Sequence, residues 1–247
     1  MHSFCTVQAI NKHHGFTLIE ILIALLISSI ILGSMHAAYV AQQRSQTSQQ
    51  QVVEMQQNLR SAMSFLSSEI RMAGYKPPSS NQATGITGAG VSKGRIQFTW
   101  EKDTNTVPSG PDMNIIYRFS ASDDSTPADG VADTGVGGAA SFNRSINGGG
   151  LQPVADNIVA VEFWYAFEDT TDNGVYDPVK TLTPLASQIK DIRAVTISLL
   201  ARSANIDRDF TNSMTYRSAS GQTWGPYDDM YRRRLLISTV QLRNIGL

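Results

Sequence analysis

The sequence of residues 16–43 reads FTLIEILIALLISSIILGSMHAAYVAQQ, and Glu20 is its only formal charge. As a helix, the part from Phe16 to Val40 would extend about 37 Å at roughly 1.5 Å per residue, enough to cross a hydrocarbon core of about 30 Å. The run has no polar stripe, so a membrane segment explains it better than a buried helix of a soluble protein. We therefore expect a membrane-spanning helix near the start of the chain.

The charges around this segment predict its orientation. Residues 12–14, Lys-His-His, precede it with no acid before them, so that side is expected to stay cytoplasmic and the remainder to be exported. Glu20 is costly in lipid unless it meets a cation, and the span contains neither Lys nor Arg. A cut between Gly15 and Phe16 would supply that cation as the new α-amine of Phe16.

Residues 12–20, KHHGFTLIE, resemble the prepilin cleavage and methylation motif of type IV pilins. The resemblance implies that a membrane prepilin peptidase cuts after Gly15 and methylates the new N-terminal Phe16. It also implies that Glu20 is the glutamate used in filament assembly. The domains expected are a leader peptide over residues 1–15, a transmembrane and assembly helix over 16–40, an amphipathic continuation of that helix over 41–74, and a head over 75–247.

The continuation of the helix shows in the spacing of its apolar residues. The stretch Ala41–Ala73 contains no Gly or Pro, and its apolar residues recur three and four positions apart, which predicts one apolar helix face. Gly74, followed by the pair Pro77-Pro78, predicts the end of the helix. The apolar stripe consists of Val52, Met55, Leu59, Ala62, Leu66, Ile70 and Ala73.

The head alternates apolar and polar residues in short runs, which is typical of β-strands. Strands are expected over Ile96–Trp100, Asn114–Ser120, Ile158–Phe167, Ile192–Ala201 and Leu235–Leu242. The low-complexity stretches Ser79–Gly90 and Asp123–Gly150 predict long loops without strands. One helix followed by strands predicts an α+β fold, and the resemblance implies a pilin-like fold with an antiparallel β-sheet packed on the long N-terminal helix.

Composition limits the chemistry of the head. The chain has one cysteine, Cys5, and four histidines, the last of which is His36. Cysteine nucleophiles, Ser-His-Asp triads and Cys/His zinc sites are therefore excluded from the head, and we predict that the protein is not an enzyme. The chain has 20 basic and 21 acidic residues, so net charge alone gives no reason to expect a polyanion as ligand.

Residues 169–180 resemble part of a calcium loop. Oxygen-bearing residues hold its first, third, fifth and ninth positions around Gly174 at the sixth, namely Asp169, Thr171, Asn173 and Asp177. Lys180 holds the twelfth position, where such a loop needs an acid, so an Asn-Gly hairpin turn is the preferred interpretation. Calcium stays open as an alternative, and no other cofactor is expected. Asp123–Asp133 is a weaker metal candidate.

Residues 232–234, Arg-Arg-Arg, form with Arg243 the only basic cluster in the sequence. Such a cluster could contact DNA phosphates or acidic lipid, but the pair Asp228-Asp229 lies close by and weakens its field. We therefore expect a solvated entrance to a strand at this place and no nucleic-acid partner.

The length of the chain, residues 72–75 (MAGY) and residues 234–244 (RLLISTVQLRN) resemble PilW-type minor pilins. The resemblance implies a structural filament subunit that primes or supports pilus assembly. It implies other pilins, the prepilin peptidase, an inner-membrane assembly platform and, before assembly, the lipid bilayer as partners. The protein would first span the bacterial inner membrane once, with a cytoplasmic N-terminus and a periplasmic head, and then enter the pilus. Two alternatives stay open, a J-type pseudopilin of type II secretion and a membrane-anchored binding or adhesion module.

Overall fold

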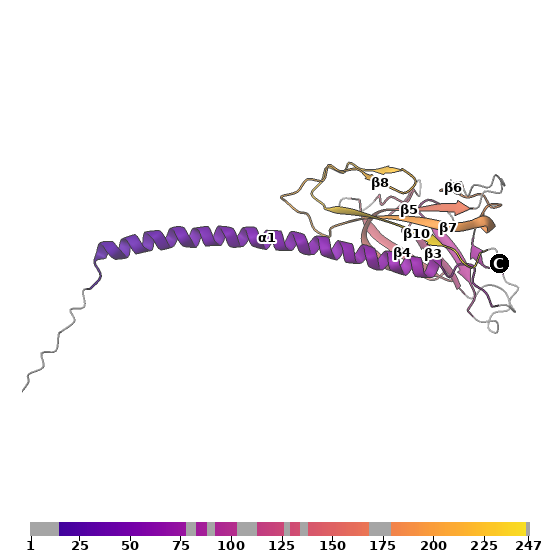
Figure 1. Ribbon diagram of the computed structural model, residues 1–247, viewed down its shortest axis with the longest axis horizontal. Coiled ribbons are helices and arrows are strands. Elements are labelled where there is room, and N and C mark those ends of the chain that lie inside the picture. Colours follow the sequence, from indigo (N-terminus) through magenta and orange to yellow (C-terminus); the bar gives the residue numbers. More distant parts are fainter. Residues whose placement is uncertain are drawn as a thin grey trace, which may run out of the picture. The chain divides into compact units, whose positions relative to one another are not determined.

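The computed structural model describes residues 15–77, 83–87, 92–102, 113–125, 129–133, 138–167 and 179–245 (Figure 1). Its elements are α1 (Leu18–Ile70), β1 (Gly85–Ile86), β2 (Ile96–Trp100), β3 (Met113–Arg118), β4 (Ala140–Ile146), β5 (Gln152–Phe167), β6 (Val179–Thr181), the 3-10 helix η2 (Ile189–Asp191), β7 (Ile192–Arg202), β8 (Tyr216–Arg217), β9 (Thr223–Trp224) and β10 (Arg233–Gln241). The chain divides into two compact units, residues 1–48 and 49–247, and α1 supplies residues to both.

The second unit is built on one antiparallel sheet. Within the described residues the strand order is β1-β2-β3-β4-β5-β7-β10, with β6 added to β5, and β8 and β9 form a separate ribbon. Every pairing between these strands is antiparallel. One long helix and an antiparallel sheet confirm the predicted α+β fold. All five predicted strands are present, although β5 begins six residues before the predicted start at Ile158.

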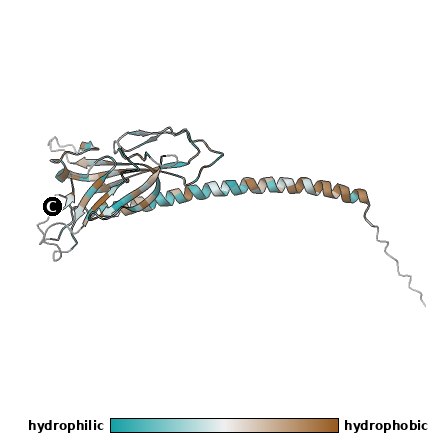
Figure 2. Cartoon of the chain, turned by 180° about the vertical axis from the view of Figure 1, so that it is seen from behind, coloured by the Kyte–Doolittle hydropathy of each residue, from teal (hydrophilic) through white to brown (hydrophobic). Residues whose placement is uncertain are grey.

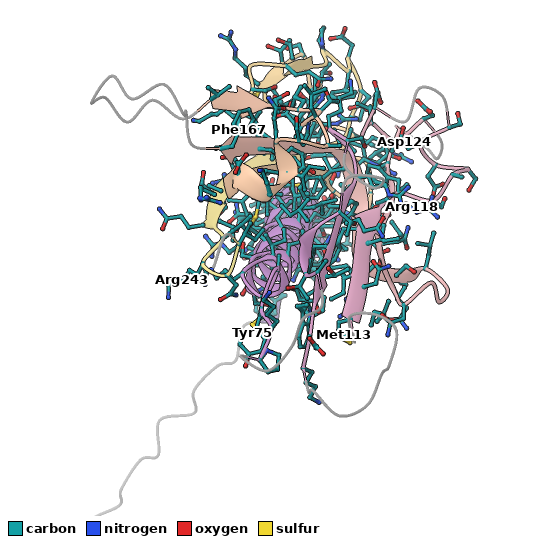
Figure 3. The ribbon with its side chains drawn as sticks, turned by 90° about the vertical axis from the view of Figure 1, so that its right-hand side faces the viewer. Tyr75, Met113, Arg118, Asp124, Phe167 and Arg243 are labelled. Carbon is teal, nitrogen blue, oxygen red and sulfur yellow. The ribbon has the colours of Figure 1, made fainter. Side chains whose placement is uncertain are left out.

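The second half of α1 packs on one face of this sheet and forms the main core. Figure 3 shows the strands beside the coil of α1, with Met113 and Arg118 at the two ends of β3. The predicted apolar stripe is confirmed, because its members from Met55 onward are buried and Val52 is half-buried. Aromatic rings continue the core across the sheet from β2 to β5, with centroid separations of 6.3 Å for Phe98–Tyr117, 6.1 Å for Tyr117–Phe142 and 6.4 Å for Phe142–Phe163.

An ion pair fastens the end of α1 to the sheet. The carboxylate of Glu69 accepts hydrogen bonds from the hydroxyl of Tyr117 on β3 and from the guanidinium of Arg144 on β4, the latter through Nε at 2.9 Å. Burial of the ring raises the pKa of Tyr117 far above its ordinary value, and the bond to Glu69 adds to that shift, so the hydroxyl stays a donor. Arg144 also lies over the ring of Phe65 on α1, 5.4 Å from its centroid.

The helix ends near the place that its sequence predicts. Regular α-helix stops at Ile70, and the chain tightens through residues 71–74, where the N–H of Met72 donates to the carbonyl of Glu69 at 2.9 Å. Gly74 then takes a φ of +82°. A Cβ at that position would lie 2.9 Å from the carbonyl oxygen of Asn244, so glycine is required both by its φ and by this close approach.

The other face of the sheet is covered by residues 203–232, the excursion between β7 and β10 that carries β8 and β9. Trp224 of this excursion is buried against Ala160 on β5 and Leu200 on β7. Glu162 on β5 is 1% exposed, and its carboxylate accepts hydrogen bonds from the hydroxyls of Ser218 at 2.8 Å and Ser220 at 2.7 Å. A buried carboxylate is tolerated only when donors surround it, so these serines hold the excursion against the sheet.

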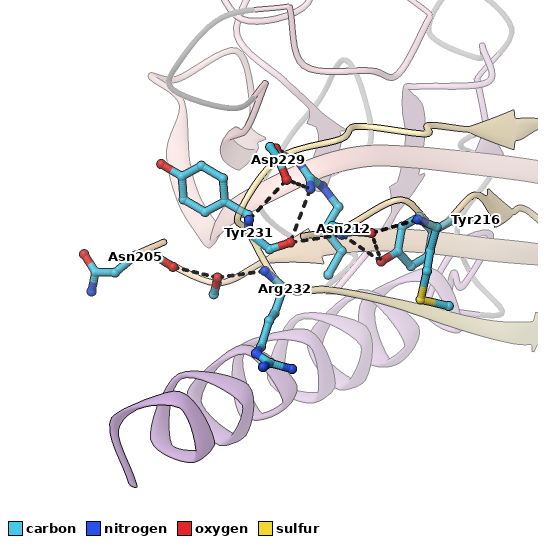
Figure 4. Close-up of polar contacts among 9 residues, drawn as sticks. Asn205, Asn212, Tyr216, Asp229, Tyr231 and Arg232 are labelled. Carbon is cyan, nitrogen blue, oxygen red and sulfur yellow. Dashed lines mark hydrogen bonds and ion pairs between the residues drawn. The ribbon is translucent and has the colours of Figure 1, made fainter. Parts of the chain in front are cut away.

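The base of the excursion is tied to the start of β10 by polar contacts (Figure 4). Asn212 is fully buried, and its side-chain amide donates to the carbonyl of Tyr231 at 2.9 Å and to the hydroxyl of Tyr216 at 3.1 Å. The guanidinium of Arg232 donates to the carboxylate of Asp207 at 2.8 Å and lies 4.3 Å from the ring centroid of Phe210.

The expectation of a solvated strand entrance at the basic cluster is wrong for Arg233. Its side chain is enclosed, donates through Nη1 and Nη2 to the two carboxylate oxygens of Asp229 at 2.5 and 2.6 Å, and lies 3.8 Å from the ring centroid of Tyr227. The acids near the cluster therefore do more than weaken its field, because Asp229 and Asp207 each bind one of its arginines directly.

The expectation that the two low-complexity stretches contain no strands is also wrong. β4 lies inside Asp123–Gly150, and the two-residue strand β1 lies inside Ser79–Gly90. The register of β4 against β5 shifts between Ala140 and Phe142 and again between Phe142 and Asn143. These irregularities break the alternation of apolar and polar residues by which a strand is recognised in a sequence.

Candidate functional site

The first turn of α1 forms a capping box around Thr17 and Glu20. Thr17 precedes the first helical residue, Leu18, and its hydroxyl accepts a hydrogen bond from the N–H of Glu20 at 3.3 Å. In return, Oε2 of Glu20 accepts hydrogen bonds from the N–H of Thr17 at 2.8 Å and from its hydroxyl at 2.9 Å. This reciprocal pattern satisfies donors that a helix start otherwise leaves unpaired, and it places a negative charge where the helix dipole favours one.

The two oxygens of the Glu20 carboxylate are used unequally. Both bonds from Thr17 reach Oε2, and Oε1 receives no hydrogen bond from a described residue. Glu20 therefore has one oxygen engaged within its own helix and one oxygen available to a donor outside it. A cationic amine is the donor that suits this oxygen best in apolar surroundings.

The side chains that surround Glu20 are apolar and uncovered. A shallow groove beside Glu20 is lined by Phe16, Ile21, Ala24, Leu25 and Ser28. Phe16 is 85% exposed, and residues 15–39 all have exposed side chains. Figure 2 shows this part of α1 as hydrophobic, whereas later turns become mixed and hydrophilic. An uncovered apolar surface of this extent needs a bilayer or neighbouring protein around it.

By length and composition, α1 is apolar enough to cross a membrane, since its most apolar 18-residue window has a mean hydropathy of 2.4. Two hydroxyl groups in this part are satisfied within the helix. Ser29 donates to the carbonyl of Leu26 at 2.7 Å, and Ser34 donates to the carbonyl of Ile30 at 2.9 Å. Such bonds suit serines to an environment without water.

Gly15 and Phe16 lie next to this capping box, directly before Thr17. The N–H that caps Glu20 belongs to the peptide between Phe16 and Thr17, so a cut between Gly15 and Phe16 would leave the capping box complete. A Cβ built on Gly15 meets no atom within 4 Å. The structure thus brings the predicted cleavage position, the predicted N-terminal residue and the predicted assembly glutamate into one short segment.

The calcium candidates Asp169, Thr171, Asn173 and Asp177 lie outside the described residues. The acids of the weaker candidate are described, and they bind backbone groups or nearby side chains. Asp124, which Figure 3 labels, accepts hydrogen bonds from the N–H groups of Asp129 and Gly130, each at 3.0 Å, and burial raises its pKa. Asp133 accepts from the N–H of Ser125 at 2.9 Å. In the described ranges, no group of three or more His, Cys, Asp or Glu side chains is arranged to hold a metal.

Sequence reasoning assigned no role to Thr17, although the sequence carries its signal. A threonine followed three positions later by glutamate, before an apolar run, is the pattern of a capping box. The cost of a charge in lipid singled out Glu20, but it did not identify Thr17 as the hydrogen-bond partner of Glu20.

Comparison with known proteins places pilin features at both ends of the chain. Residues 138–244 match the family model described as type IV pilus-assembly protein W, and residues 10–35 match the model of the prokaryotic N-terminal methylation motif. A solved structure of a type IV-like pilin from Thermus thermophilus aligns with a TM-score of 0.42 and 13% sequence identity, over 77% of this chain and 97% of that chain. No curated protein sequence matches the chain.

Proposed function

We propose that the chain is a minor type IV pilin and that it acts as a non-enzymatic filament subunit that primes or supports pilus assembly. A prepilin peptidase would remove residues 1–15 and methylate Phe16. The subunit would wait in the inner membrane, with its N-terminus on the cytoplasmic side and its head in the periplasm. It would then join other pilins on an inner-membrane assembly platform. The match to pilus-assembly protein W favours this function over that of a type II secretion pseudopilin.

One observation carries the proposal, the half-engaged carboxylate of Glu20 on an uncovered apolar helix. Oε2 is held by Thr17, which keeps the carboxylate at the start of the helix, and Oε1 is available. After processing, the α-amine of Phe16 would carry a positive charge at a helix N-terminus, where the dipole disfavours it. An amine from a neighbouring subunit that reaches Oε1 would neutralise two charges, each of which is costly in lipid or in a filament core.

Two substitutions of Glu20 separate the charge from the cap. Glu20→Gln keeps an acceptor for Thr17 and removes the charge, because glutamine also completes a capping box. Glu20→Val removes both. We expect both variants to be processed and neither to enter pili, as measured by immunoblotting of sheared pili and by mass spectrometry of the mature N-terminus. Normal incorporation of the glutamine variant would contradict charge pairing and would leave only the cap as the role of Glu20.

The calcium interpretation of residues 169–180 stays a prediction. Isothermal titration of the whole protein in detergent with calcium, compared with Asp169→Ala, tests it directly. Heat that is present in the native chain and absent in the variant would indicate an ion site, and equal titrations would favour the hairpin turn.

A further inference from the structure

Among the described strands, β10 stands at the end of the sheet and pairs with β7 alone. Its register against β7 is continuous from Arg233 to Gln241. Just beyond the two ends of the strand, the carbonyl of Arg232 accepts from Ser203 at 2.7 Å and the N–H of Leu242 donates to Arg193 at 2.8 Å. Bonding alternates along an antiparallel pair, so the even-numbered residues of β10 bond to β7.

The odd-numbered residues of β10 consequently direct their N–H and C=O groups away from the sheet. Leu235, Ile237 and Thr239 are the central three, and no described residue forms a backbone hydrogen bond at this outer edge. Natural edge strands are usually protected from pairing by charges, proline or bulges. Here the central residues carry none of these, and the side chain of Ile237 is 44% exposed.

A cationic groove runs between this edge and α1. It is lined by Arg60, Met63, Ser64, Ser67, Ser68 and Arg71 from α1 and by Leu236 and Ser238 from β10. Arg60 and Arg71 are exposed, and neither side chain forms an ion pair or hydrogen bond with a described residue. Met63 and Leu236 are the apolar residues of the groove, four serines line it as well, and both of its charged residues are arginines.

We propose that β10 binds an extended segment of another polypeptide as an additional strand, with acidic side chains turned toward Arg60 and Arg71. The main-chain groups of the odd-numbered residues would supply the hydrogen bonds, and the groove would supply selectivity. The side chains on the other face of the added strand would be apolar and would lie beside Ile237.

The spacing of the two arginines defines the pattern of acids in the segment. Arg60 and Arg71, the latter one residue beyond α1, stand eleven positions apart, which is about 16 Å at 1.5 Å per residue and equals roughly five residues of strand. Because alternate residues of a strand share a face, the matching acids stand four or six positions apart.

The charge of the groove also indicates what the occupant is not. β10 of a second copy contains no acid to meet Arg60 and Arg71, and its exposed Arg234 would bring a further positive charge to the groove. The occupant is therefore a different chain, and the proposed function makes the head of a neighbouring pilin the natural source. The identity of the neighbour rests on the proposed function, whereas the addition of a strand to β10 can occur without a filament.

Binding to the full chain in detergent micelles tests the proposal. The probe is a fluorescent nine-residue peptide that alternates threonine and valine, with two of its threonines, four positions apart, replaced by glutamate. Its counterpart carries lysine in place of glutamate. We expect the acidic peptide to bind at least about tenfold more tightly than the lysine peptide, with an affinity that falls as salt rises.

Two pairs of variants locate the site. Ile237→Pro removes an outward N–H without removing a bond to β7, a position at which an edge strand tolerates proline, and it should weaken binding about tenfold or more. Its control, Ile237→Val, should bind within about twofold of the native chain because it keeps that N–H. The double variant Arg60→Glu and Arg71→Glu should weaken binding by a similar factor, whereas Arg208→Glu, an exposed arginine outside the groove, should not.

Amide hydrogen exchange decides whether a strand is added. Peptide binding should slow exchange at Leu235, Ile237 and Thr239 and leave Leu236 and Ser238 unchanged, since the latter already bond to β7. Binding without this odd-residue protection, equal binding of the lysine peptide, or no binding of the acidic peptide would each overturn the proposal. None of these outcomes bears on processing or on Glu20, so failure here is distinguishable from failure of the proposed function.

Discussion

Glu20 meets two requirements that each favour a carboxylate at this position. Its bonds with Thr17 complete the start of a helix, and its free oxygen is suited to an amine from outside. The sequence alone predicts the second requirement, because an isolated acid in an apolar run needs a cation. The first requirement, the helix cap, follows from the pair Thr17 and Glu20 in the sequence. Only the structure shows that a single carboxylate oxygen of Glu20, Oε2, is enough to form the cap.

Gly15 provides a test of processing that the fold does not confound. Because no atom lies within 4 Å of a Cβ at this position, Gly15→Leu should leave the helix and head unchanged. We expect this variant to accumulate as a precursor that retains residues 1–15, detected by intact-mass measurement of the membrane fraction. Gly33→Ala is a matched control, since Gly33 also has open space around it, and it should be processed normally. A mature mass for the leucine variant would contradict the cleavage position.

Asp229 is expected to contribute stability through Arg233. Removing one member of an enclosed ion pair leaves the other charge without its partner, so Asp229→Asn should lower the free energy of unfolding by about 3 kcal/mol at pH 7. Urea unfolding of the full chain in detergent measures this change. Asp209→Asn, on the same excursion and exposed, should change it by less than about 0.5 kcal/mol. Equal effects of the two substitutions would show that the pair with Arg233 contributes nothing.

The same pair predicts a dependence of stability on pH. Burial alone would raise the pKa of Asp229, but the hydrogen bonds from Arg233 and from the N–H of Tyr231, together with the charges of Arg233 and Arg202, bring it below its ordinary value. A group with a lowered folded pKa stabilises the fold above its unfolded pKa of about 3.9 and loses that contribution as the pH falls through the folded pKa. The native chain should therefore lose more stability below about pH 4 than Asp229→Asn does.

At the scale of elements, regular patterns were predictable and interrupted ones were not. The apolar stripe of α1 and the alternation in β2 are regular enough to predict both the element and its buried face. β5 and β7 were predicted as strands from their apolar residues, but burial of both their faces was not predicted. β4 was missed because its sequence, ASFNRSI, is short and contains few apolar residues, and glycine-rich sequence surrounds it. The burial of Glu162 was not predicted, because the serines that bind its carboxylate lie more than fifty residues later in the chain.

The contact between helix and sheet gives an element-level prediction at Glu69. Glu69→Gln removes the charge that binds Arg144 and weakens the acceptor for Tyr117, so unfolding free energy should fall by about 3 kcal/mol. Glu54→Gln is a matched control on the same helix, because Glu54 is exposed and its substitution should cost less than about 0.5 kcal/mol. Thermal unfolding followed by circular dichroism reports both. A Glu69 variant as stable as the Glu54 variant would show that apolar packing alone fastens α1 to the sheet.

At the scale of the whole molecule, the two units differ in what stabilises them. The unit of residues 49–247 encloses its own core, whereas the described residues of the unit 1–48 expose nearly all their side chains. The first unit therefore depends on lipid or on neighbouring helices for burial of its apolar surface. This asymmetry agrees with the proposed function, in which the N-terminal segment leaves a bilayer and enters a filament while the head remains folded.

Two truncations test this division. A variant that begins at Gln49 keeps every core residue of the second unit, so it should be soluble without detergent and should melt within a few degrees of the full chain, measured by calorimetry. A variant that begins at Tyr75 loses seven apolar residues of the core, namely Met55, Leu59, Ala62, Met63, Leu66, Ile70 and Ala73. At about 1.5–3 kcal/mol for each large buried side chain, this loss is as large as the whole stability of a typical domain, about 5–15 kcal/mol. The shorter variant should consequently be unfolded or insoluble, and a folded, soluble product would show that the sheet can form its core without α1.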